Sequence, residues 1–211
     1  LIRNDFPILK TKVGGHQIVY FDNAATTQRP LPVVNAVLDY TTHENGNPHR
    51  GAHIFAISAS EAYDTSKEVV RDFIHARSEK EIIYTRNTSE SLNLVARSYG
   101  ETHLKAGDHI LSTIAEHHSN LVTWQRVAKK TGATLDYIYV DKETGHFPEE
   151  ELKKIDDPRV KLFAFAEVSN VLGIDFDPKP LIQRAHAHGA IVVLDGAQST
   201  PHKIVDVQDL D

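Results

Sequence analysis

Two kinds of apolar pattern alternate along most of the chain. Short aliphatic runs of strand length are followed by longer segments in which apolar residues recur at helical spacing. The pattern predicts strands over residues 81–85, 108–113, 134–140, 160–168 and 191–194, and helices over 58–76, 87–100, 121–132, 148–155 and 179–189. This alternation favours an α/β fold that is doubly wound, with a mainly parallel sheet in a three-layer α/β/α arrangement.

The last predicted strand, Ile191–Leu194, is aliphatic at every position, which fits a strand covered on both faces. Asp195 follows it directly, and Gly196 comes next. Open α/β sheets bind ligands beyond the carboxyl ends of their strands, so Asp195 is a candidate site residue. The alternative is that it only caps a turn, as an aspartate after a strand often does.

Composition limits the classes of partner. The 211 residues are 40% hydrophobic, which is enough for a globular core, and the net charge of −6 is dispersed without long runs. We therefore expect no nucleic-acid or membrane partner. The first 50 residues are rich in turn signals and predict an arm or loop region. No signal peptide and no cysteine is found, so we expect a cytoplasmic protein without disulfides or thiolate metal sites.

Polar stretches follow several of the predicted strands. In "TRNTSES", Asn87 and Glu90 have the spacing of a capping box. Thr88 and Ser89 begin the predicted helix, where free amides, hydroxyls and the helix dipole favour a phosphate group. Plain helix capping is the alternative for this stretch.

The stretch "AEHHSN" places His117 and His118 after another strand. An imidazole there can stack on a planar ring or transfer a proton, whereas the alternative is a surface pair. The thirteen histidines show no HExxH-type spacing, so we expect no metal. A phosphate site, a stackable imidazole and a carboxylate at a strand end together favour pyridoxal phosphate, because Asp195 could keep the pyridine nitrogen protonated.

Five motifs now allow a family comparison. They are "YFDNAATTQRP" (Tyr20–Pro30), "HRGAH" (His49–His53), "AEHHSNLVTWQ", "EVSNVLG" and "VLDGAQS". In this order they resemble the SUF-type cysteine desulfurases and the related selenocysteine lyases, which are class V aminotransferases of fold-type I. The resemblance implies the large-domain fold of pyridoxal-phosphate transferases, with an incomplete cofactor-binding domain over residues 51–211 and no small carboxy-terminal domain.

The resemblance also implies roles for individual residues. Thr88 and Ser89 would hold the phosphate, His117 would stack on the ring, Asn170 would lie near the ring oxygen, Asp195 would pair with the pyridine nitrogen, Gln198 would bond the ring hydroxyl, and Asn23, Ala24 and His53 would border the substrate pocket. One departure is "NTS" (Asn87–Ser89) where the family usually has "GTT". The hydroxyl is kept, but the backbone conformation at Asn87 is in question.

The lysine that carries the cofactor as a Schiff base would follow a further strand in this family. Lys203 precedes the position of that strand, so we exclude it as the Schiff-base lysine. The cysteine loop and the carboxylate-binding arginine are also expected outside these residues. We therefore expect the chain alone to be inactive.

The function implied for the whole enzyme is conversion of L-cysteine to L-alanine, with sulfur transfer to an enzyme thiol for iron–sulfur cluster assembly. A homodimer and a sulfur-acceptor protein are implied with it. Two alternatives remain open: another class V enzyme, such as an aminotransferase, a kynureninase-like lyase or an epimerase, or a non-catalytic scaffold or dimerisation fragment.

Overall fold

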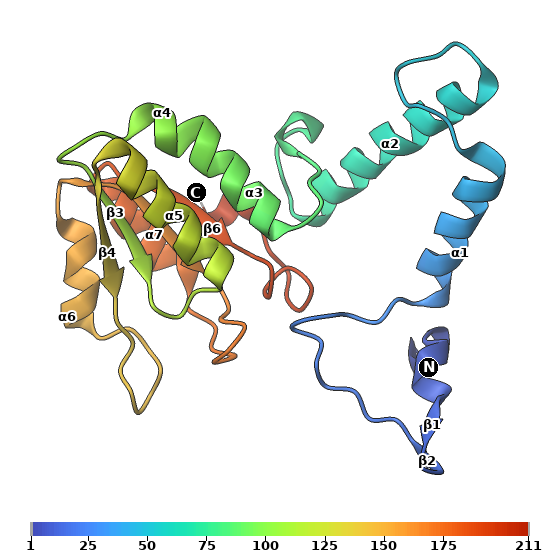
Figure 1. Ribbon diagram of the computed structural model, residues 1–211, viewed down its shortest axis with the longest axis horizontal. Helices are drawn as coiled ribbons and strands as arrows, with labels where there is room; N and C mark the ends of the chain where they lie inside the picture. The colour runs from blue at the N-terminus through green and yellow to red at the C-terminus, as the bar shows by residue number, and fades with distance from the viewer. Residues whose placement is uncertain (1, 211) are drawn as a thin grey trace. The chain divides into compact units, whose positions relative to one another are not determined.

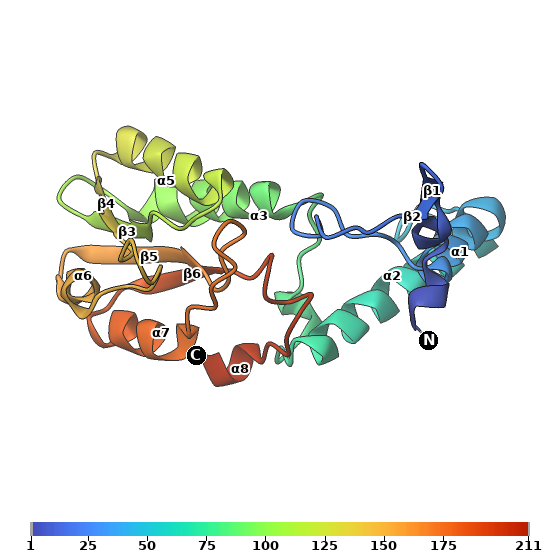
Figure 2. The same cartoon turned by 90° about the horizontal axis from the view of Figure 1, so that it is seen from below.

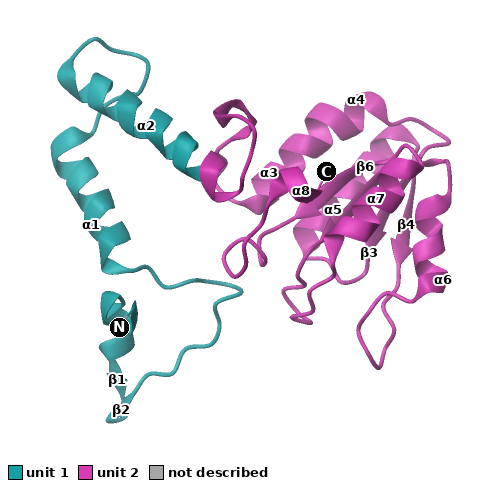
Figure 3. Cartoon of the chain, turned by 180° about the vertical axis from the view of Figure 1, so that it is seen from behind, with its two compact units in different colours: residues 1–70 teal, residues 71–211 magenta. Residues whose placement is uncertain are grey.

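The computed structural model describes residues 2–210 and divides the chain after Val70 into two compact units (Figure 3). The division falls within the long helix α2 (Ile54–Phe73). The sequence-based boundary at residue 50 remains a prediction.

Unit 1 consists of short elements. They are 3-10 turns over Ile2–Asp5 and Pro7–Lys10, a hairpin of β1 (Lys12–Val13) and β2 (His16–Gln17), helix α1 (Leu31–Asp39), a π-helical turn over Tyr40–Glu44 and most of α2. Ala56 and Ala59 are the only buried side chains among residues 2–70. The described part of unit 1 therefore has little hydrophobic core of its own.

Unit 2 is built on a parallel sheet of four strands (Figure 1). The strands are β3 (His109–Thr113), β4 (Thr134–Ile138), β5 (Val160–Ala166) and β6 (Ile191–Asp195). Their order is β4-β3-β5-β6, so the chain first extends the sheet on one side of β3 and then returns to extend it on the other. The predicted doubly wound α/β fold is confirmed.

Helices cover both faces of this sheet (Figure 2). One face carries α3 (Thr88–Val95), a π-helical turn over Ala96–Gly100, α4 (Glu101–His103) and α5 (His118–Thr131). The other carries α6 (Glu149–Leu152), a 3-10 turn over Lys153–Asp156, α7 (Pro178–Ala187) and α8 (Val207–Leu210). None of the helices within residues 2–210 is long and apolar enough to cross a membrane.

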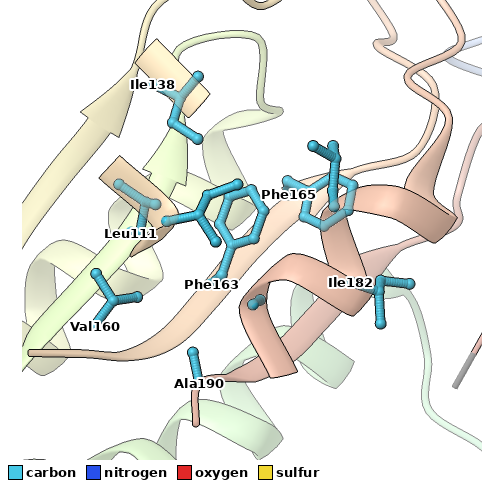
Figure 4. Packing of buried hydrophobic residues seen from close by; sticks show 10 residues of the cluster. Leu111, Ile138, Val160, Phe163, Phe165, Ile182 and Ala190 are labelled. Carbon is cyan, nitrogen blue, oxygen red and sulfur yellow. The ribbon is translucent and has the colours of Figure 1, made fainter. Parts of the chain in front are cut away.

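Alternate residues of β5 point into two separate cores. Phe163 and Phe165 belong to the core on the α7 side (Figure 4), where their rings stack with centroids 4.5 Å apart. Leu162 and Ala164 belong to the core on the α5 side, which contains the fully buried Trp124. Because successive side chains of a strand point to opposite faces, the apolar run over residues 162–166 of β5 supplies both cores.

Two sequence-based expectations need correction. Residues 81–85 form no strand: Glu79–Glu81 is a 3-10 turn, and the residues after it pair with no other strand among those described. Their β-propensity is insufficient without a partner strand. The side chains of Ile191–Leu194 are half-buried rather than covered, because β6 is the edge strand of the described sheet.

Replacing Phe163 by Ala should lower the free energy of unfolding by about 3–5 kcal/mol, because the substitution leaves a cavity beside Phe165 in a fully buried core. Denaturant unfolding followed by circular dichroism measures this loss. Val122→Ala is the matched control: Val122 on α5 is 58% exposed, and its loss should change the stability by less than about 0.5 kcal/mol. Equal losses for the two variants would contradict the assigned core.

Candidate active site

An open hollow of about 430 Å³ lies in unit 2 between α3 and the end of β6. Its wall includes Leu92, Val95 and Val193, which are apolar, and Thr88 and Asp195, which are polar. The hollow therefore combines an apolar surface with a hydroxyl and a carboxylate from elements that are distant in sequence.

Asp195 ends β6 and is buried, with 6% of its surface exposed. Parallel pairing places it opposite Ala166 of β5. Its Oδ1 accepts the backbone N–H of Ala197 at 3.0 Å, and the residue also lines the hollow. Asp195 thus caps the turn and also lines a potential binding site, so the two sequence interpretations are compatible.

Thr88 and Ser89 begin α3, as expected. The N-cap Asn87 accepts the Glu90 N–H at 3.0 Å, and the N–H groups of Thr88 and Ser89 before it have no intrahelical acceptor. Asn87 has a φ of −172°, an extended conformation that any residue adopts. The asparagine therefore does not distort the loop. Thr88 lines the hollow, whereas Ser89 is exposed and lies outside its lining.

His117 is the N-cap of α5 and is exposed. Its Nδ1 accepts the Ser119 N–H at 3.2 Å and lies 2.7 Å from the Ser119 hydroxyl. Because Nδ1 accepts a backbone N–H, the neutral ring carries its proton on Nε2. The described residues contain no group of three His, Asp or Glu side chains that could hold a metal.

The other predicted site residues fall into two groups. Asn170 follows β5 and Gln198 follows β6; both are half-buried at the carboxyl ends of strands, outside the lining of the hollow. Asn23, Ala24 and His53 belong to unit 1 and are exposed there. Their part in a substrate pocket remains a prediction.

Glu116 is a residue that the sequence analysis missed. It follows β3, is only 8% exposed, and accepts hydrogen bonds on both carboxylate oxygens. Oε1 accepts from the Thr113 hydroxyl at 2.5 Å and the Ala166 N–H at 3.0 Å, and Oε2 accepts from Asn120 Nδ2 at 2.6 Å. Burial raises the pKa of Glu116 to about 7, and the nearby Asp195 carboxylate acts in the same direction.

Lys203 is held by two carboxylates. Its Nζ lies 2.7 Å from Oε1 of the buried Glu167 and 2.8 Å from Oδ2 of Asp175. Hydrogen bonds to Asp175 and Glu167 raise the pKa of the Lys203 amine. A Schiff base requires a neutral amine, so this environment supports the exclusion of Lys203 as the cofactor-bearing lysine.

Comparison with known proteins now decides the family. The family described as "Aminotransferase class-V" matches residues 19–211.

The chain belongs to the class V aminotransferase family. It is 46% identical over 210 residues to a probable cysteine desulfurase of Synechocystis sp. (strain ATCC 27184 / PCC 6803 / Kazusa), covering 100% of this chain and 50% of the relative. A probable cysteine desulfurase of Halalkalibacterium halodurans is also 46% identical, over 209 residues, with 99% of this chain and 51% of the relative covered. The chain thus spans about half the length of these two relatives.

Solved structures of class V relatives agree with this assignment. The apo structure of the cysteine desulfurase from Thermococcus onnurineus NA1 has a TM-score of 0.89 and 40% identity, covering 99% of this chain and 50% of that one. The cysteine desulfurase CsdA from Escherichia coli, in an S-sulfonic acid form, has a TM-score of 0.81 and 36% identity, covering 91% and 48%. The resemblance and the fold type expected from the motifs are confirmed.

The raised pKa of Glu116 predicts a pH-dependent stability. The folded chain binds the Glu116 proton more tightly than the unfolded chain, whose carboxyl has a pKa near 4.5. The free energy of unfolding should therefore fall by on the order of 3 kcal/mol as the pH rises from about 4.5 to about 7. Above about pH 7 it should level off.

Urea unfolding of the wild type and of Glu116→Gln at several pH values measures this effect. The neutral side chain removes the titration, so the difference in stability between the two proteins should change across this window. Glu150→Gln provides a control on the exposed part of α6. A constant difference between the wild type and Glu116→Gln from pH 4.5 to pH 7 would contradict the raised pKa.

Proposed function

We propose that this chain supplies the cofactor-binding part of a cysteine desulfurase. The observation that carries the proposal is that the buried carboxylate of Asp195 and the start of α3 at Thr88 line the same hollow. The 46% identity to probable cysteine desulfurases supports this member of the class V family.

Class V aminotransferases and cysteine desulfurases use pyridoxal phosphate. The residues present fit this group. The first amides of α3 and the hydroxyls of Thr88 and Ser89 suit a phosphate, since the helix start has no intrahelical acceptor for them. Asp195 supplies a carboxylate for a protonated ring nitrogen, and Leu92, Val95 and Val193 supply apolar surface for a ring.

When bound, pyridoxal phosphate supplies an electron sink for the bonds at the α-carbon of an amino acid. In our proposal Asp195 holds the proton on the ring nitrogen, because a charged hydrogen bond is strong where water is excluded. His117 covers the ring and presents its Nε2 proton, with Ser119 fixing the ring orientation. Asn170 and Gln198 contact the polar ring substituents, and Asn23, Ala24 and His53 border the substrate.

The substrate proposed is L-cysteine. Its conversion with an enzyme thiol gives L-alanine and a persulfide on that thiol, a balanced exchange in which one sulfur atom moves. No cysteine occurs among these 211 residues, so the thiol is not supplied by them. Delivery to a sulfur-acceptor protein for iron–sulfur cluster assembly, and a cytoplasmic location, complete the proposal.

We also propose that the protein acts as a homodimer. Unit 1 exposes large apolar side chains, including Phe21 at 91%, Phe55 at 50% and Val37 at 63%. Exposed apolar surface of this kind is typical of segments that are covered by another chain or domain. Sedimentation of the protein that carries this sequence tests the proposed dimer.

The reaction class is tested by product analysis. The protein that carries this sequence, loaded with pyridoxal phosphate, should form L-alanine and sulfide in equal amounts from L-cysteine in the presence of a reductant. Transfer of the amino group to a keto acid without sulfide release would instead favour an aminotransferase. Residues 1–211 alone should form neither product, because Lys203 is held as a protonated amine.

Asp195→Ala should lower the rate of alanine formation by about two to three orders of magnitude, because the ring nitrogen loses its charged partner. Asp136→Ala is the matched control: Asp136 lies on β4, outside the lining of the hollow, and pairs with His109. It should retain a rate within about twofold of the wild type. A wild-type rate for Asp195→Ala would show that Asp195 only caps the turn after β6 and has no part in catalysis.

A further inference from the structure

Glu116 connects three elements at the carboxyl ends of the sheet strands, where the candidate site lies. Its Oε1 accepts from Thr113 at the end of β3 and from the Ala166 N–H at the end of β5. Its Oε2 accepts from Asn120 in the first turn of α5. One buried side chain therefore fixes the ends of two strands and the start of a helix relative to one another.

The partners of Glu116 are neutral hydrogen-bond donors. The charged group that acts on it is the carboxylate of Asp195, which is repulsive. A buried carboxylate without a cation is costly, so stability alone does not account for an acid at this position. Both carboxylate oxygens of Glu116 nevertheless accept hydrogen bonds. The network continues to Trp124, whose indole N–H donates to Asn120 Oδ1 at 2.8 Å.

The network reaches two of the residues that the proposed function assigns to the cofactor ring. His117 follows Glu116 directly, and its orientation is set by the same helix start that Asn120 holds. On the other side, Ala166 donates its N–H to Glu116 and is paired with Asp195 across the β5–β6 ladder. Glu116 is therefore one peptide bond away from His117 and one hydrogen bond away from the residue that is paired with Asp195.

We propose that Glu116 is a positioning residue that holds His117 and Asp195 at a fixed spacing, so that a planar cofactor ring fits between them. The inference rests on the proposed function, since it assigns the ring to these two residues. Glu116 itself touches neither ring nor substrate in this proposal. It acts through the turn that presents His117 and through the pairing that presents Asp195.

Glu116→Gln tests the proposal because it keeps the side-chain shape but replaces one acceptor oxygen by an NH₂ donor. The Ala166 N–H and Asn120 Nδ2 are both donors, so one of them must then face another donor. The double variant Glu116→Gln/Asn120→Asp restores an acceptor opposite the new NH₂ group and keeps one for Trp124. Rescue by this pair would show that the bonded geometry matters.

Trp124→Phe is the control for a purely structural effect. It removes the indole N–H bond to Asn120 and disturbs a fully buried ring, but leaves the Glu116 bonds to Thr113 and Ala166 in place. Thermal melting shows how far each variant is destabilised. A loss of binding that follows stability alone would appear in Trp124→Phe as well as in Glu116→Gln.

The binding probe is pyridoxine 5′-phosphate, which carries the ring and the phosphate but no aldehyde to react with surface lysines. Binding to the protein that carries this sequence, after removal of its cofactor, is measured by calorimetry near pH 8, where Glu116 is mostly ionised. Inorganic phosphate is titrated in parallel, because the start of α3 should bind it independently of Glu116. The imidazole resonances of His117 report its orientation without any ligand.

We expect Glu116→Gln to raise the Kd for pyridoxine 5′-phosphate by about tenfold or more and to shift the His117 resonances. The double variant should return both close to wild type, Trp124→Phe should keep the wild-type Kd, and phosphate binding should be unchanged throughout. Wild-type Kd and His117 resonances in Glu116→Gln would overturn the inference, as would an equal loss of binding in Trp124→Phe.

Failure of the proposed function gives a different result. If the wild-type chain binds no pyridoxine 5′-phosphate, the cofactor assignment loses its support. The positioning of His117 is then judged on its resonances alone: a shift in Glu116→Gln that the double variant reverses supports it, and unchanged resonances overturn it.

Discussion

Strand β5 is hydrogen-bonded along both edges, to β3 and to β6, and this double pairing determines where the site residues lie. In the ladder with β6, Ala166 is paired with Asp195. The Ala166 N–H donates to Glu116, which lies beyond the end of β3. Phe163 and Leu162 hold the strand from opposite faces, in two separate cores. A slip of one residue would exchange the two faces and move Asp195 away from α3.

Three buried acidic residues lie near the carboxyl ends of these strands. Asp195, Glu116 and Glu167 are each less than 10% exposed, and within residues 2–210 only Glu167 of the three is paired with a lysine, Lys203. Carboxylates in surroundings of low dielectric favour a neighbouring positive charge. A protonated ring nitrogen beside Asp195 would meet this requirement. The electrostatics and the apolar lining of the hollow therefore favour the same class of ligand.

Much of this arrangement could be predicted from sequence, for reasons that differ between elements. Strand β5 was found because the apolar run over residues 162–166 serves two cores, and α3 was found because Asn87 caps it. Residues 81–85 were assigned wrongly because pairing, which local composition does not encode, decides whether a strand forms. Glu116 was overlooked beside two histidines, because it lies three residues beyond the end of β3, whereas Asp195 follows the apolar run of β6 directly.

The extended backbone at Asn87 has a consequence for how this family varies. With φ at −172°, position 87 makes no demand for glycine, and its side chain can take up the cap of α3. Substitution there changes the motif without changing the path of the chain. A search that insists on the glycine would overlook proteins of this kind, whereas one that follows the hydroxyl at Thr88 and the strand that ends in Asp195 would retain them.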